Sequence, residues 1–301
     1  TYPLIGNYGV QPAHFESDGP KIEGYVIHEL CREPSHSASE MTLDEWLEES
    51  GIPGIEAVDT RMLTKKIRVK GVMLGILQTY EKGDEPDFNK LLEEAERIPD
   101  PYEEDLVGEV SIRDVERLDV NGEVDIVLID CGVKRNIIRN LLDRKVNVIR
   151  VPYKTSASEI LKYEPDGVLI SNGPGDPKRC RQTIEAVREL SETDIPMLGI
   201  CLGVQLLALA MGGDTYKLKF GHRGQNHPVI DLDTQRCYIT SQNHGFAVEG
   251  ESLKDTGLEV FLLNANDKTV EGLRHRSKPI RAVQFHPEAS PGPNDTNFIF
   301  D

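Results

Sequence analysis

The chain has 301 residues, enough for about two domains, and its 38% hydrophobic and 28% charged residues are typical of a globular protein. It contains no apolar run of the roughly 18 residues that a membrane span needs, so we expect no membrane partner. A formal net charge of −17 would repel a phosphate backbone, so nucleic acid is not an expected partner either.

The cysteines indicate a reducing compartment. They are five in number, widely spaced and without a C-x-x-C pair, which predicts neither a disulfide framework nor a zinc site. No chemistry follows from the spacing of His222, His227 and His244, so no metal site is predicted. We therefore expect a cytoplasmic protein in which one thiol can be catalytic.

Residues 1–120 predict a small α+β domain. The opening residues read as the interior of a domain, so we expect the chain to begin inside it. Strand-like runs lie at 24–30, 54–60 and 72–78, and helix-like runs at 42–50 and 61–71. Residues 81–123 are polar, so we expect a linker or domain edge near 115–123 and place the boundary at about residue 120.

From residue 121 to residue 301, strands alternate with helices, as expected for buried parallel strands joined by helical crossovers. We expect strands at 124–130, 146–152, 166–171 and 196–200, helices at 134–145, 156–163, 181–190 and 201–213, and antiparallel strands at 236–242, 245–250, 259–266, 269–275 and 280–287. The fold class is therefore α/β, with a doubly wound mixed sheet. Ligands of such sheets bind at the carboxyl ends of the parallel strands.

Residues 199–203, Gly-Ile-Cys-Leu-Gly, place Cys201 on a turn between a predicted strand and a predicted helix. This G-x-C-x-G pattern is the cysteine counterpart of a nucleophile elbow, whose small neighbours permit a strained turn. The helix that begins there offers unpaired N–H groups and the positive end of its dipole, which favour a thiolate. Most free cysteines are packing residues, but this turn favours Cys201 as a nucleophile.

A proton donor for the nucleophile is offered by His286, in the segment Phe-His-Pro-Glu. A residue before proline favours an extended conformation, so His286 and Glu288 should project to the same side. The carboxylate would then orient the imidazole, as in a catalytic triad. A histidine alone is more often structural, but paired with the elbow it predicts catalysis.

The third motif, Ser-Asn-Gly-Pro-Gly-Asp-Pro at 171–177, directly follows a predicted strand. It lacks the third glycine of G-x-G-x-x-G, and G-x-x-x-x-G-K-[ST] does not occur in the sequence, so no nucleotide site is predicted. Its backbone N–H groups could instead form an oxyanion hole with the N–H of Leu202. The alternative is a plain Pro-Gly turn.

These three motifs, in this order, resemble the class I glutamine amidotransferase family over residues 124–301. Within that family, further segments resemble the small subunit of carbamoyl-phosphate synthetases. They are TYPLIGNYGV and DTRMLTKKIRVKG in the first domain and DCGVKRNIIRNL, KFGHRGQNHPV, SQNHGFAV and HPEASPGP in the second. The resemblance covers nearly the whole chain and implies a glutaminase subunit.

The resemblance also implies a role for each matching residue. Cys201 would attack the side-chain amide of L-glutamine to form a glutamyl thioester. His286 would protonate the leaving ammonia and then activate water, and Glu288 would orient the imidazole. Glutamine would be held by Gly173, Gly175, Leu202, Gln205, Asn243, Gly245 and Phe246. Val204 departs from the pattern, because relatives often have histidine there.

The implied partner is a large carbamoyl-phosphate synthetase subunit, which would use ATP, Mg²⁺ and bicarbonate, whereas this chain would need no cofactor. One alternative is a glutaminase for another synthetase, of the anthranilate or GMP type, and the first domain argues against it. Another is a non-catalytic regulatory module, and the presence of Cys201, His286 and Glu288 argues against that. The sequence leaves open whether arginine or pyrimidine synthesis is served.

Overall fold

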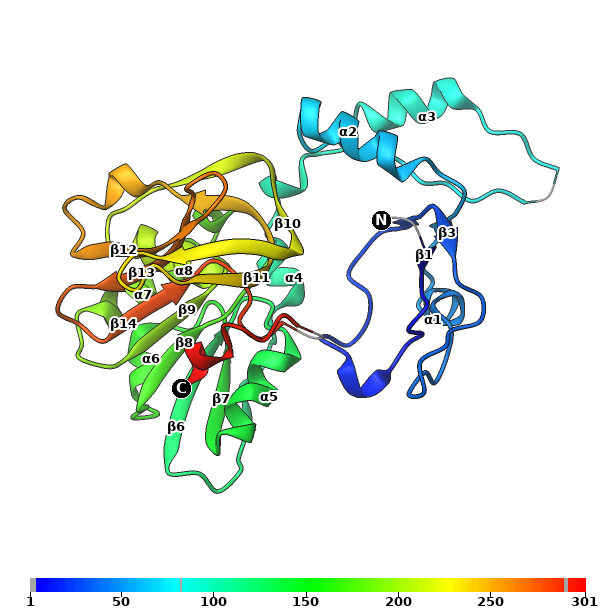
Figure 1. Ribbon diagram of the computed structural model, residues 1–301. Helices are drawn as coiled ribbons and strands as arrows, with labels where there is room; N and C mark the ends of the chain where they lie inside the picture. Colours follow the sequence, from blue (N-terminus) through cyan, green and yellow to red (C-terminus); the bar gives the residue numbers. More distant parts are fainter. Residues whose placement is uncertain (1–3, 82, 290–291) are drawn as a thin grey trace. The chain divides into compact units, whose positions relative to one another are not determined.

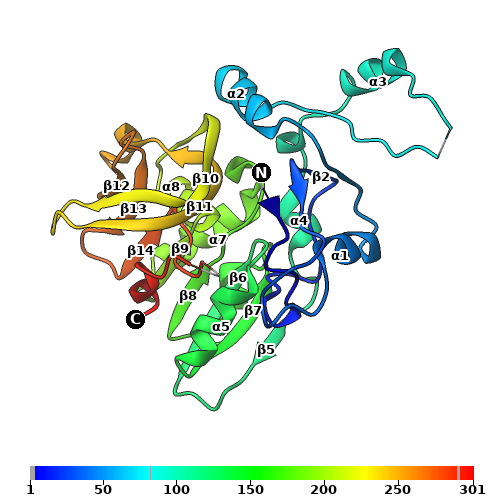
Figure 2. The same ribbon diagram turned by 45° about the vertical axis from the view of Figure 1, so that its right-hand side comes forward.

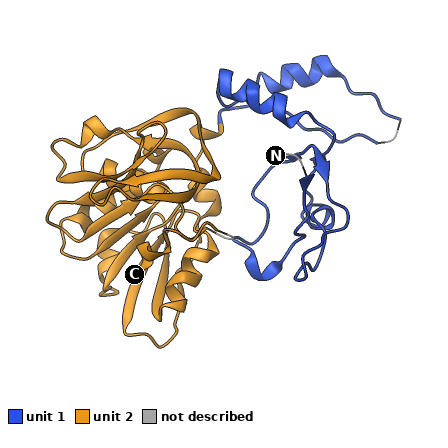
Figure 3. Ribbon diagram, in the orientation of Figure 1, with its two compact units in different colours: residues 1–100 blue, residues 101–301 orange. Residues whose placement is uncertain are grey.

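The computed structural model describes residues 4–81, 83–289 and 292–301. The chain divides into two compact units, residues 1–100 and 101–301 (Figure 3). Residues 101–120, which the sequence analysis placed in the first domain, lie in the second unit. Within the described ranges, no helix is both long enough and apolar enough to cross a bilayer.

The first unit is a small α+β assembly. Its elements are β1 (Leu4–Ile5), η1 (Pro12–His14), β2 (Tyr25–Val26), β3 (Glu29–Leu30), α1 (Leu43–Glu49), β4 (Gly54–Ile55), α2 (Thr60–Lys70) and α3 (Phe88–Ala95). β1 pairs with β3 and β2 with β4, both in parallel. Thr42 begins α1 through a capping box with Glu45, which explains why the sequence placed this helix correctly.

One prediction for the first unit is wrong, and one helix there was not predicted. Residues 72–78 form no strand: Val72, Met73 and Leu74 are each nearly half exposed, and an apolar run becomes a strand only where a neighbour completes its hydrogen-bond ladder. The polar region after residue 81 contains α3, which Asp87 begins by accepting hydrogen bonds from two backbone N–H groups. Leu91 and Ala95 are partly buried and the other residues of α3 are exposed, so this helix resembles a linker in composition.

The second unit is built on a ten-stranded mixed sheet in the order β11-β10-β12-β13-β14-β9-β8-β6-β7-β5 (Figure 1). Its strands are β5 (Glu116–Leu118), β6 (Val124–Asp130), β7 (Val146–Pro152), β8 (Gly167–Ile170), β9 (Met197–Ile200), β10 (Thr215–Asp231), β11 (Cys237–Val248), β12 (Leu258–Asn264), β13 (Val270–His275) and β14 (Ile280–Val283). Neighbouring strands from β14 to β7 are parallel, and the outer pairs are antiparallel. The predicted α/β class and mixed sheet are confirmed.

Helices cover both faces of the parallel strands (Figures 1 and 2). They are α5 (Arg135–Asp143), α6 (Ala157–Leu161), α7 (Arg181–Ser191) and α8 (Leu202–Ala210), with the short α4 (Leu106–Val110), η2 (Pro101–Glu103), η3 (Pro177–Arg179), η4 (Gly250–Leu253) and η5 (Asn297–Phe300) beside them. Leu128 of β6 packs on the face that α5 covers, whereas its neighbours Val127 and Ile129 pack on the face of α6, α7 and α8. This alternation follows from the two-residue period of a strand.

The antiparallel part departs from the sequence prediction in two ways. β10 was not predicted, because its central residues, Lys-Phe-Gly-His-Arg-Gly-Gln-Asn-His, show no apolar alternation and its register with β11 shifts twice. β11 is one continuous strand rather than the two runs expected at 236–242 and 245–250. Its pairing with β10 carries the ladder through the polar residues between those runs.

The three predicted motifs lie at the carboxyl ends of three central strands. β14, β9 and β8 are adjacent and parallel, so their carboxyl ends meet. The loop at 171–177 follows β8, Cys201 follows β9, and His286 lies shortly after β14. The strand order therefore brings together residues that are more than a hundred positions apart in the chain.

Candidate active site

Cys201 sits on a strained turn. Its backbone φ is 55° and ψ is −100°, values that residues other than glycine rarely adopt. Its N–H donates to the carbonyl of Val283 at 2.8 Å, which anchors the turn to β14, and the next residue, Leu202, begins α8. The side chain is 4% exposed. The fold thus holds the thiol in the geometry of a nucleophile elbow.

The glycines on either side of Cys201 are required by close packing. A Cβ on Gly203 would lie 2.3 Å from the carbonyl oxygen of Ile170, and a Cβ on Gly199 would lie 2.7 Å from the backbone of Gly203. Backbone atoms cannot rotate away as a side chain can, so any larger residue would push the elbow off β8. This confirms the tight turn expected from the G-x-C-x-G pattern.

His286 is held between the nucleophile and a carboxylate. Its Nδ1 lies 2.6 Å from Oε1 of Glu288, its backbone N–H donates to the carbonyl of Ser241 at 2.9 Å, and the Cys201 thiol is near enough to raise the pKa of the ring. Both His286 and Glu288 are at most 3% exposed. Although the chain turns after His286 rather than remaining extended, the two side chains meet as the sequence predicted.

Two residues from the start of α5 hold Glu288 in place. Nζ of Lys134 lies 3.5 Å from Oε1 of Glu288, and the amide of Asn136 donates to the Glu288 backbone carbonyl. Burial alone would raise the pKa of Glu288, but the charges of His286 and Lys134 lower it. The Glu288 side chain therefore stays ionised beside the imidazole.

The same contacts favour a protonated imidazole. Burial alone would lower the pKa of His286, but the Glu288 carboxylate and the Cys201 thiol group raise it to about 9. A charged imidazolium beside a sulfur nucleophile can both stabilise a thiolate and donate a proton to a leaving group.

Gln284 is a site residue that the sequence analysis missed. Its amide donates to Sγ of Cys201 at 3.7 Å, and its Oε1 accepts from Nε2 of Gln205 at 3.0 Å. Gln205 also donates to the carbonyl of Phe246 at 2.9 Å, so this pair of amides links the elbow to β11. The signal was present in the alternation of Gln284, His286 and Glu288, whose spacing of two residues puts them on one side of an extended chain.

The loop after β8 packs against the start of α8. A Cβ on Gly173 would lie 2.1 Å from the carbonyl oxygen of Cys131 and 2.7 Å from the side chain of Leu202, so this loop and the elbow approach closely. Gly175 adopts a positive φ of 87°. Asn172 ties the loop to the start of α5 by accepting from the Lys134 N–H and donating to the Gly132 carbonyl.

The remaining predicted glutamine ligands lie on β11. Asn243 is exposed, Gly245 is partly buried, and Phe246 is buried against the ring of Tyr102, with ring centroids 5.4 Å apart. A Cβ on Gly245 would lie 3.1 Å from the Tyr102 hydroxyl oxygen. The predicted ligand residues thus come from the ends or edges of β8, α8 and β11, and their contacts with glutamine stay predictions.

Comparison with known proteins identifies the family. The profile of the glutamine amidotransferase class-I family matches residues 127–301, and that of the carbamoyl-phosphate synthase small chain, CPSase domain, matches residues 1–77. The chain is 56% identical to the carbamoyl phosphate synthase small chain of Methanopyrus kandleri and 52% identical to that of Archaeoglobus fulgidus. These alignments cover all of this chain and 83% and 82% of those proteins. The chain belongs to the carbamoyl phosphate synthase small chain family.

A solved structure supports the fold of the second unit. A Thermoplasma acidophilum protein described as a component of GMP synthase superposes with a TM-score of 0.51 at 25% identity, covering 59% of this chain and 92% of that one. The resemblance to the small chain of carbamoyl phosphate synthases, predicted from motifs in both domains, is confirmed by the matches over the full length.

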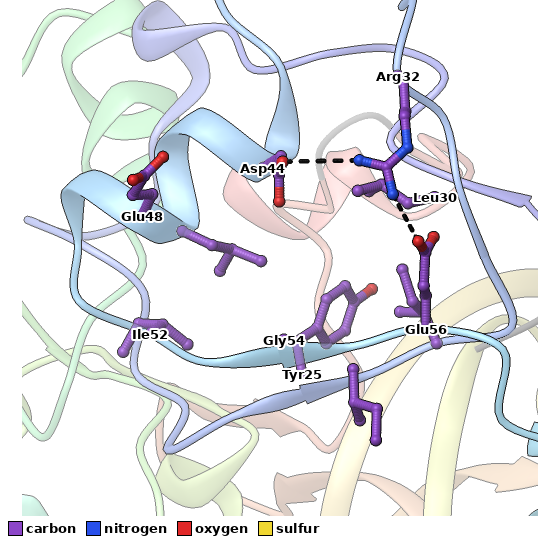
Figure 4. Close-up of a pocket in the computed structure, with 11 residues that line it drawn as sticks. Tyr25, Leu30, Arg32, Asp44, Glu48, Ile52, Gly54 and Glu56 are labelled. Atoms are coloured by element: carbon purple, nitrogen blue, oxygen red, sulfur yellow. Dashed lines mark hydrogen bonds and ion pairs between the residues drawn. The ribbon is translucent and has the colours of Figure 1, made fainter. Parts of the chain in front are cut away.

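The first unit has a pocket of about 350 Å³ between α1 and the β2–β4 pair (Figure 4). Arg32 spans its rim and pairs with Asp44 at 3.8 Å and Glu56 at 2.5 Å. The described residues that line it include no cysteine or histidine. The candidate catalytic residues Cys201, His286 and Glu288 lie in the second unit instead.

Replacing Glu288 by glutamine is expected to move the alkaline limb of the activity profile to lower pH. A raised pKa keeps His286 protonated until the pH rises through about 9, and without the carboxylate burial lowers that pKa. The measurement is kcat/KM for glutamine hydrolysis across the neutral to alkaline range. An alkaline limb unchanged in Glu288→Gln would show that His286 does not set it.

Proposed function

We propose that this chain is the glutaminase subunit of a carbamoyl phosphate synthase, hydrolysing L-glutamine to glutamate and ammonia through a thioester on Cys201. The observation that carries this proposal is the buried array in which Glu288 orients His286 toward a cysteine on a strained elbow. Such an array supplies the nucleophile, the proton donor and the orienting group that acyl transfer needs.

The first half of the reaction forms the thioester. Sγ of Cys201 attacks the side-chain carbonyl carbon of glutamine, and the carbonyl π electrons move to oxygen. The N–H of Leu202, at the start of α8, and N–H groups of the loop at 171–177 are the donors that could stabilise this oxyanion. The tetrahedral species then collapses: the C–N bond breaks, the imidazolium of His286 gives its proton to the nitrogen, and ammonia leaves.

The second half releases glutamate. The now neutral His286 takes a proton from a water molecule, whose oxygen attacks the thioester carbon. When the C–S bond breaks, Cys201 leaves as a thiolate and the imidazolium remains, which restores the starting ion pair. Glu288 keeps the same ring nitrogen directed at the reaction in both halves, since its oxygen holds Nδ1 at 2.6 Å.

The partner proposed for this subunit is the large chain of the same synthase, to which the ammonia is delivered. The sequence holds neither nucleotide-binding fingerprint considered above. ATP, Mg²⁺ and bicarbonate are accordingly assigned to the large chain, and no cofactor is assigned to this one. The five cysteines are all free, which agrees with a reducing cytoplasm.

The two alternatives are less well supported. A glutaminase of the GMP or anthranilate type would not account for the match of residues 1–77 to the small-chain domain. A regulatory module that had lost catalysis would not need to retain the contact of Glu288 with a buried His286 next to Cys201.

The direct test is to trap the thioester. Rapid acid quenching of the protein during turnover with labelled L-glutamine should leave label on the peptide that contains Cys201. Glutamate itself should leave no label, because it has no amide to displace. Label on any other peptide, or steady glutamate production with no labelled peptide at any quench time and any pH, would contradict a Cys201 thioester.

A further inference from the structure

Three buried side chains that are not part of the candidate triad converge in the second unit. His222 of β10, His244 of β11 and Glu271 of β13 are at most 7% exposed, and one ligand atom of each lies within 4.8 Å of those of the other two. His222 and His244 are cross-strand partners in the β10–β11 ladder. The three residues come from separate strands, so no ligand spacing is visible in the sequence.

Hydrogen bonding determines which nitrogen of a neutral His222 ring directs its lone pair toward Glu271. Its Nε2 lies 2.8 Å from Oδ2 of Asp267, so this nitrogen carries the proton and donates it. Its Nδ1 is buried and has no hydrogen-bond partner among the described residues. The nearest oxygen is Oε1 of Glu271, at 3.5 Å.

His244 also directs a lone pair into the cluster. Its Nδ1 lies 2.7 Å from the carbonyl oxygen of Phe246 and must donate to it, which leaves Nε2 as an acceptor 3.1 Å from Oε1 of Gln242. As placed, the Gln242 nitrogen donates to Oγ1 of Thr240, and the Thr240 hydroxyl donates its proton to the His227 carbonyl. Rotating the Gln242 amide by 180° would give His244 a donor, but it would place the amide oxygen beside Oγ1 of Thr240 and lose that hydrogen bond. Burial lowers the pKa of His244 to about 3, so a second proton on the ring is disfavoured.

Glu271 completes the set. Its Oε1 accepts from the amide of Asn264 at 3.1 Å, whereas its Oε2 is buried without a hydrogen-bond partner in the described chain. A fully buried carboxylate oxygen that lacks a donor is costly, since neither water nor protein replaces its hydration. With His222 neutral, two imidazole lone pairs and one carboxylate therefore face one another.

We propose that Nδ1 of His222, Nε2 of His244 and the Glu271 carboxylate bind a divalent transition-metal ion of the Zn²⁺ type. Two imidazoles and a carboxylate are a common ligand set for such ions. The 3.5 Å between the His222 and Glu271 atoms is close to the edge of about 3.4 Å that bonds of about 2.1 Å give in a tetrahedron. Asp267 is the positioning residue, because its carboxylate holds the ring of His222.

Such a site would join β10, β11 and β13 just beside the predicted glutamine ligands Asn243 and Gly245, which flank His244. The competing arrangement places a proton where the ion would lie. Burial would lower the pKa of His222, but the Glu271 and Asp267 carboxylates raise it to about 8, so an imidazolium between two carboxylates is the outcome to distinguish from metal binding.

The experiment measures metal binding by the full chain in a Cys201→Ser background, which removes the thiolate as a competing ligand. After treatment with a chelator, the protein is titrated with Zn²⁺ against a chromophoric chelator, and separately with Co²⁺. One equivalent of each ion is expected, with cobalt d–d absorption of a tetrahedral nitrogen and oxygen site and no thiolate charge-transfer band. Glu271→Gln should abolish stoichiometric binding, and Asp267→Asn should weaken it by about 10- to 100-fold.

His275→Asn is the matched control, because His275 lies on β13 like Glu271 but is not part of the cluster. It should bind as the background protein does. Failure of the background protein to bind one equivalent would overturn the proposal in favour of the imidazolium. The proposal would also be overturned if Asp267→Asn and Glu271→Gln, both folded by circular dichroism, bound the ion with the same affinity as the background protein.

Discussion

Cys201→Ser is expected to abolish glutamine-dependent carbamoyl phosphate formation by the complex with the large subunit, while ammonium chloride still supports it. A serine hydroxyl is a far poorer nucleophile than a thiolate paired with an imidazolium, and loss of a catalytic nucleophile typically lowers turnover by about 10⁴-fold or more. Free ammonia enters after the step that fails. The measurement is carbamoyl phosphate made per minute with each nitrogen source.

His286→Asn serves as the matched variant in this experiment. It removes the proton donor but leaves the thiol, so it should lose glutamine-dependent synthesis and keep ammonia-dependent synthesis as well. Assembly with the large subunit is checked by gel filtration for each variant. Equal loss with both nitrogen sources from an assembled complex would argue against ammonia delivery and for a structural or regulatory role of this chain.

Gly203→Ala is expected to destabilise the protein and to lower glutamine hydrolysis by at least about 100-fold. The new Cβ would lie 2.3 Å from the carbonyl oxygen of Ile170 and 3.0 Å from its carbonyl carbon, so α8 or β8 must shift. Overpacking of this kind commonly costs about 1–3 kcal/mol, and a displacement of the nucleophile by about 1 Å can cost about 100-fold in rate. Thermal unfolding and glutamate release measure the two effects.

The control for this substitution is Gly250→Ala, at the start of η4. A Cβ there would meet only a side-chain methyl of Val270 at 3.4 Å, an ordinary contact, so both Tm and turnover should stay close to those of the parent. Parental values for Gly203→Ala would contradict the close approach of elbow and strand. A fall in Tm with unchanged turnover would show that the shift is absorbed away from Cys201.

Local patterns in the sequence determined most elements of the second unit and singled out Cys201, His286 and Glu288, which the fold then brings together. Strand and helix periods placed β6, α5 and β7 within one residue at nearly every end, because each reflects preferences that act over a few neighbouring residues. The glycines beside Cys201 and the proline after His286 marked the turns in the same way. The apolar run at 72–78 misled because composition alone does not provide a strand with a partner.

The tertiary structure alone decided which distant side chains meet. The contact of Gln284 with Cys201, the support of Glu288 by Lys134, and the cluster of His222, His244 and Glu271 all depend on strand order and register. Those are set by packing across the whole sheet, because a shift of one residue in pairing would turn each side chain to the opposite face. No periodicity within a single strand carries that information, which is why these contacts emerge only when the strands lie beside one another.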